Sequence, residues 1–197
     1  GNGVTPEYLA KSTQRYQAAV MFLRLMGEET KAAAFDGKEN FADAKLLAAS
    51  MQKYLGYLKA NPTFGWNGIG GNKFDPVSVT SAQNYYKVML EALGYKQGTD
   101  FQYADVIKFA ESKGLTKVAS VAKFTNNDLA IATVEALRLE IKAGGKTLCK
   151  DLVDRGIITE AAVTAADATL LVPPAKPVTA AVYSVAATNG QLTVVMS

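Results

Sequence analysis

Three segments of the chain repeat one pattern, and this repeat limits the possible folds more than any other feature. Each segment begins with polar residues and continues as an amphipathic helix, over residues 13–27, 79–95 and 124–137. Repeated helical units cannot each bury their apolar face alone, so neighbouring units pack together around a shared core. The sequence therefore predicts a mainly α fold built from repeated units. Three side chains occupy the same place near the start of each segment: Gln17, Gln83 and Asp128.

Further helices are expected where apolar residues recur at helical spacing between start and stop signals. These helices are predicted over residues 43–58, 103–112, 147–155 and 159–166. Two of the repeated segments also carry the residues of a capping box, in which a polar side chain at the helix start bonds with a residue three positions later. The predicted pairs are Thr80 with Gln83 and Thr125 with Asp128.

The composition changes near residue 168, which indicates a boundary. From there to residue 197 the only charged side chain is Lys176, and three prolines stop any helix. Two β-prone runs, 179–185 and 191–195, flank Asn189-Gly190, a strong hairpin signal. The sequence thus predicts a helical region, a proline-rich linker, and a segment that is either the start of a β-domain or a hairpin docked on the helices. The boundaries are 1–167, 168–178 and 179–197.

The composition also excludes several kinds of chemistry. The 197 residues include no histidine, so they cannot form a Ser-His-Asp triad, a Cys-His pair or a histidine-bound zinc site. Cys149 is the only cysteine and cannot form an internal disulfide. A net charge of +3 is too small to indicate nucleic-acid binding, and no apolar run is long enough to span a membrane. We therefore expect no catalytic residues, no metal and no cofactor.

Residues 68–95 carry the most specific motifs. Gly71, Phe74 and Pro76 precede Val79-Thr80-Ser81-Ala82-Gln83, and the helix closes with Ala92-Leu93-Gly94. These motifs resemble the repeat of the S-layer homology (SLH) domain, and a weaker resemblance extends over roughly residues 5–167. The resemblance implies a bundle of three SLH-like helix-loop-helix units around a pseudo-threefold axis, followed by a short β segment that would begin an Ig-like domain. The third unit would be completed by the N- and C-terminal helices.

The same resemblance implies a non-catalytic, extracellular role in the cell wall or surface layer of a Gram-positive bacterium. The module would attach a surface-layer or other surface protein to secondary cell-wall polysaccharide that carries pyruvate groups, and it would contact other surface-layer subunits. Two alternatives remain at this point. A degenerate module would have a purely structural role in assembly, and an anchor segment would belong to a larger surface-bound hydrolase.

Ligand contacts are expected at the helix starts, where an arginine can bind an anion beside free backbone N–H groups. Only the first repeat has that arginine, because Ser81 and Asn126 replace Arg15 in the other two. Arg15 is either an anion ligand or a solvated side chain, and Trp66 either stacks on a sugar or fills the core beneath its glycine-rich loop. The expected ligand-binding residues are Arg15, Gln17, Trp66, Ser81, Gln83, Asn126 and Asp128.

Overall fold

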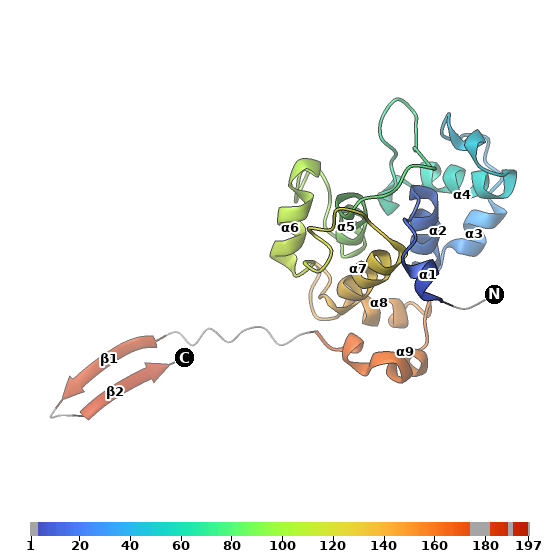
Figure 1. The fold of residues 1–197 in the computed structure, drawn as a ribbon. Coiled ribbons are helices and arrows are strands. Elements are labelled where there is room, and N and C mark those ends of the chain that lie inside the picture. The colour runs from blue at the N-terminus through green and yellow to red at the C-terminus, as the bar shows by residue number, and fades with distance from the viewer. Residues whose placement is uncertain (1–3, 174–181, 189–190, 197) are drawn as a thin grey trace.

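The computed structural model describes residues 4–173, 182–188 and 191–196 (Figure 1). The predicted fold class is confirmed at its broad level, because this part of the chain is mainly α-helical with nine α-helices. The helices are α1 (Pro6–Leu9), α2 (Arg15–Leu25), α3 (Glu29–Ala34), α4 (Ala49–Ala60), α5 (Ala82–Ala92), α6 (Val106–Lys113), α7 (Asn126–Arg138), α8 (Leu148–Asp154) and α9 (Glu160–Asp167). Four short 3-10 helices add η1 (Ala44–Leu46), η2 (Pro62–Phe64), η3 (Tyr103–Asp105) and η4 (Ala168–Leu171).

The helix starts follow the predicted caps in one case and depart from them in the other. At α7, Thr125 and Asp128 form the predicted capping box, with the Asp128 carboxylate accepting a hydrogen bond from the Thr125 backbone N–H at 2.8 Å. At α5 the predicted cap is wrong. Ser81 lies one residue closer to the helix and its Oγ accepts from the Asn84 N–H at 3.2 Å. Gln83 instead donates to the backbone carbonyl of Tyr103.

The helix predicted over residues 43–58 is also wrong in its first part. The chain forms only η1 there, and α4 begins at Ala49. The reason is a tertiary contact of Asp43, whose carboxylate accepts hydrogen bonds from the backbone N–H groups of Phe74 and Asp75 at 2.9 and 2.8 Å. These long-range bonds hold Asp43 ahead of the helix, where local spacing alone would place it inside.

The C-terminal segment contains two strands, β1 (Val182–Thr188) and β2 (Gln191–Met196), which pair antiparallel. The second strand begins where the sequence predicts it, and the first covers the described part of its predicted run, since residues 179–181 lie outside the described residues. Asn189-Gly190, the predicted turn, lies outside the described residues. Whether this hairpin begins a β-domain or docks on the helices stays a prediction.

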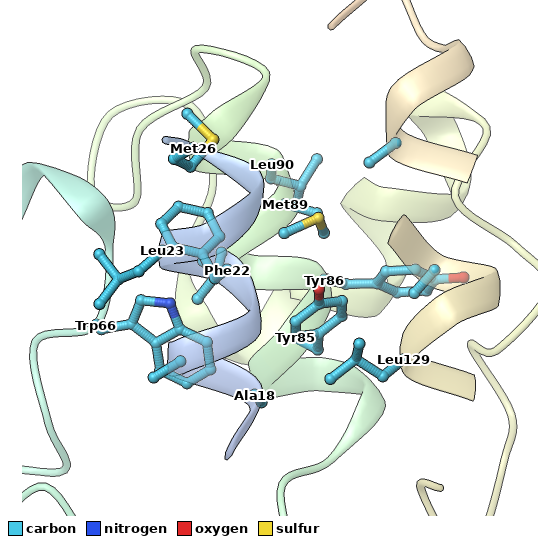
Figure 2. Close-up of a cluster of buried hydrophobic side chains, with 14 of the residues drawn as sticks. Ala18, Phe22, Leu23, Met26, Trp66, Tyr85, Tyr86, Met89, Leu90 and Leu129 are labelled. Carbon is cyan, nitrogen blue, oxygen red and sulfur yellow. The ribbon is translucent and has the colours of Figure 1, made fainter. Parts of the chain in front are cut away.

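The main core lies where α2, α5 and α7 meet, as Figure 2 shows. Phe22 and Leu23 come from α2, Met89 and Leu90 from α5, and Leu129 from α7. All five side chains are buried. Since these helices begin within the three repeated segments, the apolar faces that the repeat predicts form one continuous core.

The segment before α2 joins the three helix starts through backbone hydrogen bonds. On one side, the Arg15 N–H donates to the Ser78 carbonyl and the Thr80 N–H donates to the Thr13 carbonyl, both at 2.9 Å. On the other side, the Asn126 N–H donates to the Lys11 carbonyl, also at 2.9 Å. Residues 11–15 therefore lie between the starts of α5 and α7 and orient all three helices at one end.

The buried side chain of Tyr85 is expected to make the fold less stable at alkaline pH. Its ring is buried, and its hydroxyl lies 2.7 Å from Thr133 Oγ1 in a hydrogen bond. Burial disfavours the phenolate and raises the pKa of Tyr85 from 10.0 to about 12. The folded state therefore holds this proton more tightly than the unfolded chain, so this stabilisation is complete below pH 10 and is lost as the pH rises towards 12. Between pH 10 and pH 12, the free energy of unfolding should therefore fall by about 2 kcal/mol less in a Tyr85→Phe variant than in the native chain.

Urea denaturation at pH 8 and at several values up to pH 12 measures this difference. Tyr8→Phe is the matched control, because Tyr8 is exposed on α1. Identical pH profiles for the native chain and Tyr85→Phe would show that the buried hydroxyl does not control the alkaline loss.

Candidate functional site

A polar cleft of about 450 Å³ is the best candidate for a functional site. Its walls come from the start of α2, one side of α5, the glycine-rich loop 65–69, and the connection between α5 and α6. The lining residues are Arg15, Gly65, Trp66, Asn67, Gly68, Ile69, Asn84, Lys87, Val88, Glu91, Gln97 and Tyr103. Volumes of this size are typical of small-molecule sites.

Arg15 is the central side chain of the cleft. It is only 5% exposed, so it is not the solvated arginine that one sequence interpretation describes. Its Nε donates to the Phe74 carbonyl at 3.0 Å, and its guanidinium carbon lies 5.2 Å from the Phe74 ring centre and 5.8 Å from that of Trp66. Burial lowers the pKa of the guanidinium, and the nearby groups Tyr103, Asp75 and Asp43 act in the opposite direction.

The position of Arg15 depends on the loop that carries Phe74. Asn72 and Asp75 both adopt positive φ angles, 57° and 61°, which L-residues rarely adopt. The Asp43 carboxylate accepts from two consecutive N–H groups of this loop and so stabilises the bend. The loop in turn presents the carbonyl and the ring of Phe74 to Arg15. Asp43 is therefore a positioning residue for the cleft.

Lys87 and Glu91 form a second polar group on the wall of the cleft. Lys87 Nζ lies 2.7 Å from Glu91 Oε2 and donates to the Gly65 carbonyl at 2.6 Å. Both side chains are largely buried, so the pair is shielded from water. Gly65 has φ 81°, and a Cβ atom there would lie 1.8 Å from Glu91 Oε2. Glycine is therefore favoured here, because other residues rarely adopt this φ angle and a Cβ atom would displace the Glu91 carboxylate.

Trp66 lies beneath the loop and not on its exposed surface. It is 2% exposed and packs edge-on against Phe22, with ring centres 6.3 Å apart. The interpretation that Trp66 fills the core is confirmed, and an exposed ring that stacks on a ligand is excluded. Its indole Nε1 is buried and has no hydrogen-bond partner within the described part of the chain.

Only Arg15 and Trp66, among the expected ligand-binding residues, lie in this cleft. Gln17 and Asn126 line a second, more apolar groove of about 490 Å³ between α1, α2, α4 and α7. Asn126 accepts from Thr13 Oγ1 and donates to the Tyr8 carbonyl, so its side chain attaches α1 to α7. Arg15 and Asn126 occupy equivalent positions in the repeat, yet Arg15 lines the cleft and Asn126 lines the groove. The remaining three, Ser81, Gln83 and Asp128, make the capping and loop contacts described above.

Sequence reasoning missed Lys87, Glu91 and Tyr103 as lining residues. A lysine and a glutamate four residues apart on one helix are a detectable signal for an ion pair. That spacing does not reveal that a glycine-rich loop covers the pair. Tyr103 is 40% exposed at the rim and its hydroxyl donates to Asn84 Oδ1 at 2.9 Å, a contact across the α5–α6 connection that no local pattern indicates.

No group of three or more His, Cys, Asp or Glu side chains within the described ranges could hold a metal ion. The helices in these ranges are all too short or too polar to cross a membrane.

Comparison with known proteins gives one finding. Residues 75–157 match the family model for the N-terminal part of the X-prolyl dipeptidyl aminopeptidase PepX. The matched stretch includes α5, α6, α7 and α8 and covers less than half of the chain. No curated protein and no solved structure matches this chain.

This match overturns the SLH resemblance, because α5, the helix within its most specific motifs, lies in the stretch that matches a peptidase family. The predicted function of a cell-surface module is therefore wrong, including surface-layer attachment, carbohydrate binding at the cell wall, and the two alternatives stated with it. The expectation that the protein is not an enzyme is wrong for the same reason. The motifs misled because polar helix starts followed by an apolar helical face occur in many helical domains. The expected extracellular location and partners stay predictions.

Proposed function

We propose that this chain is part of a peptidase similar to X-prolyl dipeptidyl aminopeptidase, and that its helical region is an accessory domain of that enzyme. The observation that supports this proposal is the family-model match, which covers a structural unit from α5 to α8. The matched helices pack on each other and bury a shared polar network around Glu135 and Tyr86. The match therefore coincides with a contiguous packed part of the domain.

The accessory role follows from the chemistry that these residues can supply. The 197 residues hold no histidine, so they cannot provide the general base of a Ser-His-Asp or Cys-His centre. No metal-binding cluster occurs in the part of the chain that the structure describes. In this proposal the helical region supports or shapes the enzyme, and the groups that cleave the peptide bond lie outside this sequence.

Hydrolysis of Ala-Pro-p-nitroanilide by the native protein that contains this chain tests the proposal. We expect it to release nitroaniline several times faster from Ala-Pro-p-nitroanilide than from Ala-Ala-p-nitroanilide. The 197-residue chain alone is the control, and it should hydrolyse neither substrate. A native protein that is inactive on the prolyl substrate, or that shows no preference for it, would refute the assignment.

We also infer that the helices form three units around a pseudo-threefold axis. The backbone bonds of residues 11–15 to the starts of α5 and α7 support this arrangement. At the other end of α2, Gly27 lies against the side chain of Ile157, which follows α8. The N- and C-terminal segments therefore meet, as a third unit assembled from both ends requires. An experimental structure in which Ile157 lies away from Gly27 would contradict this arrangement.

A further inference from the structure

We propose that the peptide bond between Asp75 and Pro76 is a self-cleavage site, at which the Asp75 carboxylate attacks the backbone carbonyl carbon of its own residue. The two fragments, residues 1–75 and 76–197, stay associated through the shared core. This is the only Asp-Pro sequence in the chain. The cleavage does not depend on the proposed peptidase function, because the reacting groups all belong to one loop.

The Asp-Pro dipeptide supplies the nucleophile and the leaving group. An aspartate carboxylate can attack the carbonyl carbon of its own residue and close a five-membered cyclic anhydride. The proline nitrogen belongs to a tertiary amide, which takes up a proton and leaves more readily than a secondary amide nitrogen. Asp75 Oδ1 accepts a hydrogen bond from Ser78 Oγ, whereas Oδ2 accepts none from the described residues. Oδ2 is therefore the oxygen available for the attack.

The reaction consumes one water molecule. The new bond joins Oδ2 to the backbone carbonyl carbon of Asp75, and the bond from that carbon to the Pro76 nitrogen breaks. The nitrogen takes a proton that solvent supplies and leaves as a secondary amine. Water then opens the anhydride, so the first fragment ends in Asp75 with two carboxyl groups and the second begins with Pro76. Asp75 is partly exposed, which gives water access to the bond.

The backbone conformation of Asp75 favours cleavage. Its φ angle is 61°, in the left-handed region that L-residues rarely adopt. Aspartate tolerates this region better than most residues, but a residue before proline is further restricted to extended conformations by contact with the proline ring. Asp75 therefore holds a strained conformation in the intact chain. Cleavage removes the restriction that Pro76 imposes, so the strain lowers the barrier to breaking this bond.

Hydrogen bonds on both sides of the bond prevent this strain from relaxing. Before the bond, the Asp43 carboxylate accepts from the N–H groups of Phe74 and Asp75 at 2.9 and 2.8 Å. After the bond, the carbonyl of the buried Pro76 accepts from the Tyr16 N–H at 3.0 Å. Both partners come from distant segments of the chain. Folding therefore creates the strain, and an unfolded chain loses it.

The fragments stay together because the core uses helices from both sides of the cut. The bond lies between α4 and α5, so α2 belongs to the first fragment, and α5 and α7 belong to the second. Phe22 of α2 and Met89 of α5 are buried in one core (Figure 2). The backbone bond from the Thr80 N–H to the Thr13 carbonyl also crosses the cut. Cleavage therefore gives a two-chain domain.

Incubation of the purified full chain in mildly acidic and in neutral buffer tests the proposal. Mass spectrometry under denaturing conditions detects fragments 1–75 and 76–197, and native size-exclusion chromatography shows whether they stay together. We expect both fragments to accumulate at a rate that does not depend on protein concentration, as an intramolecular reaction requires. The same chain in concentrated urea should cleave about tenfold more slowly, because unfolding releases the strain at Asp75.

Two variants assign the reaction to this bond. Asp75→Asn removes the carboxylate and keeps a residue that tolerates a positive φ angle, and Pro76→Ala removes the tertiary amide. Each should slow the cleavage about tenfold or more. Asp105→Asn is the matched control, because Asp105 is an exposed aspartate that precedes valine, and this variant should cleave at the native rate.

Asp43→Asn tests the contribution of strain. It replaces one of the two acceptor oxygens that hold the loop, so the backbone of Asp75 can relax and cleavage should slow several-fold. A variant that circular dichroism shows to be unfolded should cleave at the slow rate of the native chain in urea.

Four results would overturn the proposal. The first is the absence of both fragments after prolonged incubation, and the second is cleavage in urea that is as fast as in buffer. The third is a rate that rises with protein concentration or is unchanged in Asp75→Asn, since either result indicates a protease. The fourth is a native cleavage rate in a folded Asp43→Asn variant. Fragments that separate during native size-exclusion chromatography would contradict the two-chain domain.

Discussion

Replacing Phe22 with alanine is expected to lower the free energy of unfolding by about 3–5 kcal/mol, because the change deletes a fully buried ring and leaves a cavity. Phe22 is 1% exposed on α2. Its ring packs edge-on against Phe64 and Trp66, with ring centres 6.2 and 6.3 Å apart. It therefore joins the first repeated helix to the glycine-rich loop of the cleft. Chemical denaturation of the full chain measures the effect, with Trp66 fluorescence and circular dichroism as probes.

Met21 provides the control on the same helix. It precedes Phe22 in sequence but is 40% exposed, so Met21→Ala should change the unfolding free energy by less than about 1 kcal/mol. Equal effects for the two variants would show that the face of α2 assigned to the core is wrong.

Replacing Glu135 with alanine is expected to cost about 3 kcal/mol or more, because it removes a buried acceptor that satisfies several donors. Glu135 Oε1 accepts from the backbone N–H groups of Thr116 and Lys117 at 3.0 and 2.8 Å, and Oε2 accepts from the Tyr86 hydroxyl at 2.7 Å. That hydroxyl in turn accepts from the Val118 N–H at 3.0 Å. The network attaches the connection between α6 and α7 to α5. Burial raises the pKa of Tyr86, and the bond to Glu135 acts in the same direction.

Two further variants separate the loss of acceptors from the loss of a charge. Glu135→Gln keeps the shape and one acceptor oxygen, so it should cost only about 1–2 kcal/mol. Glu111→Ala, at an exposed position on α6, should stay within about 0.5 kcal/mol of the native chain. A Glu135→Ala variant as stable as Glu111→Ala would show that the network does not stabilise the domain.

The helices could largely be predicted from the sequence because their signals are local. The capping box of α7 needs only Thr125 and Asp128, and a glycine with positive φ ends the segment after α2 and after α6, at Gly27 and Gly114. The start of α4 could not be predicted, since Asp43 bonds to backbone groups about thirty residues away. Long-range contacts of this kind override the local preference of a residue for a helix.

The function illustrates a different limit. Polar helix starts with an apolar helical face are features of helical packing, and they occur wherever such helices form a core. They led to an SLH interpretation of residues that match a peptidase family. The absence of histidine was a firmer guide, because it excludes particular reaction centres whatever the fold.

The sequence by itself determined the helical class, the repeated apolar faces, the strands of the C-terminal segment and the lack of histidine chemistry. These properties depend on residue type and on spacing within a few residues. Only the tertiary structure decided that Arg15 is buried with no ion pair to any described residue, that Trp66 lies beneath its loop, and that Gln17 and Asn126 line a different groove. Burial and the partners of a charge depend on which distant segments meet, and spacing along the chain does not contain that information.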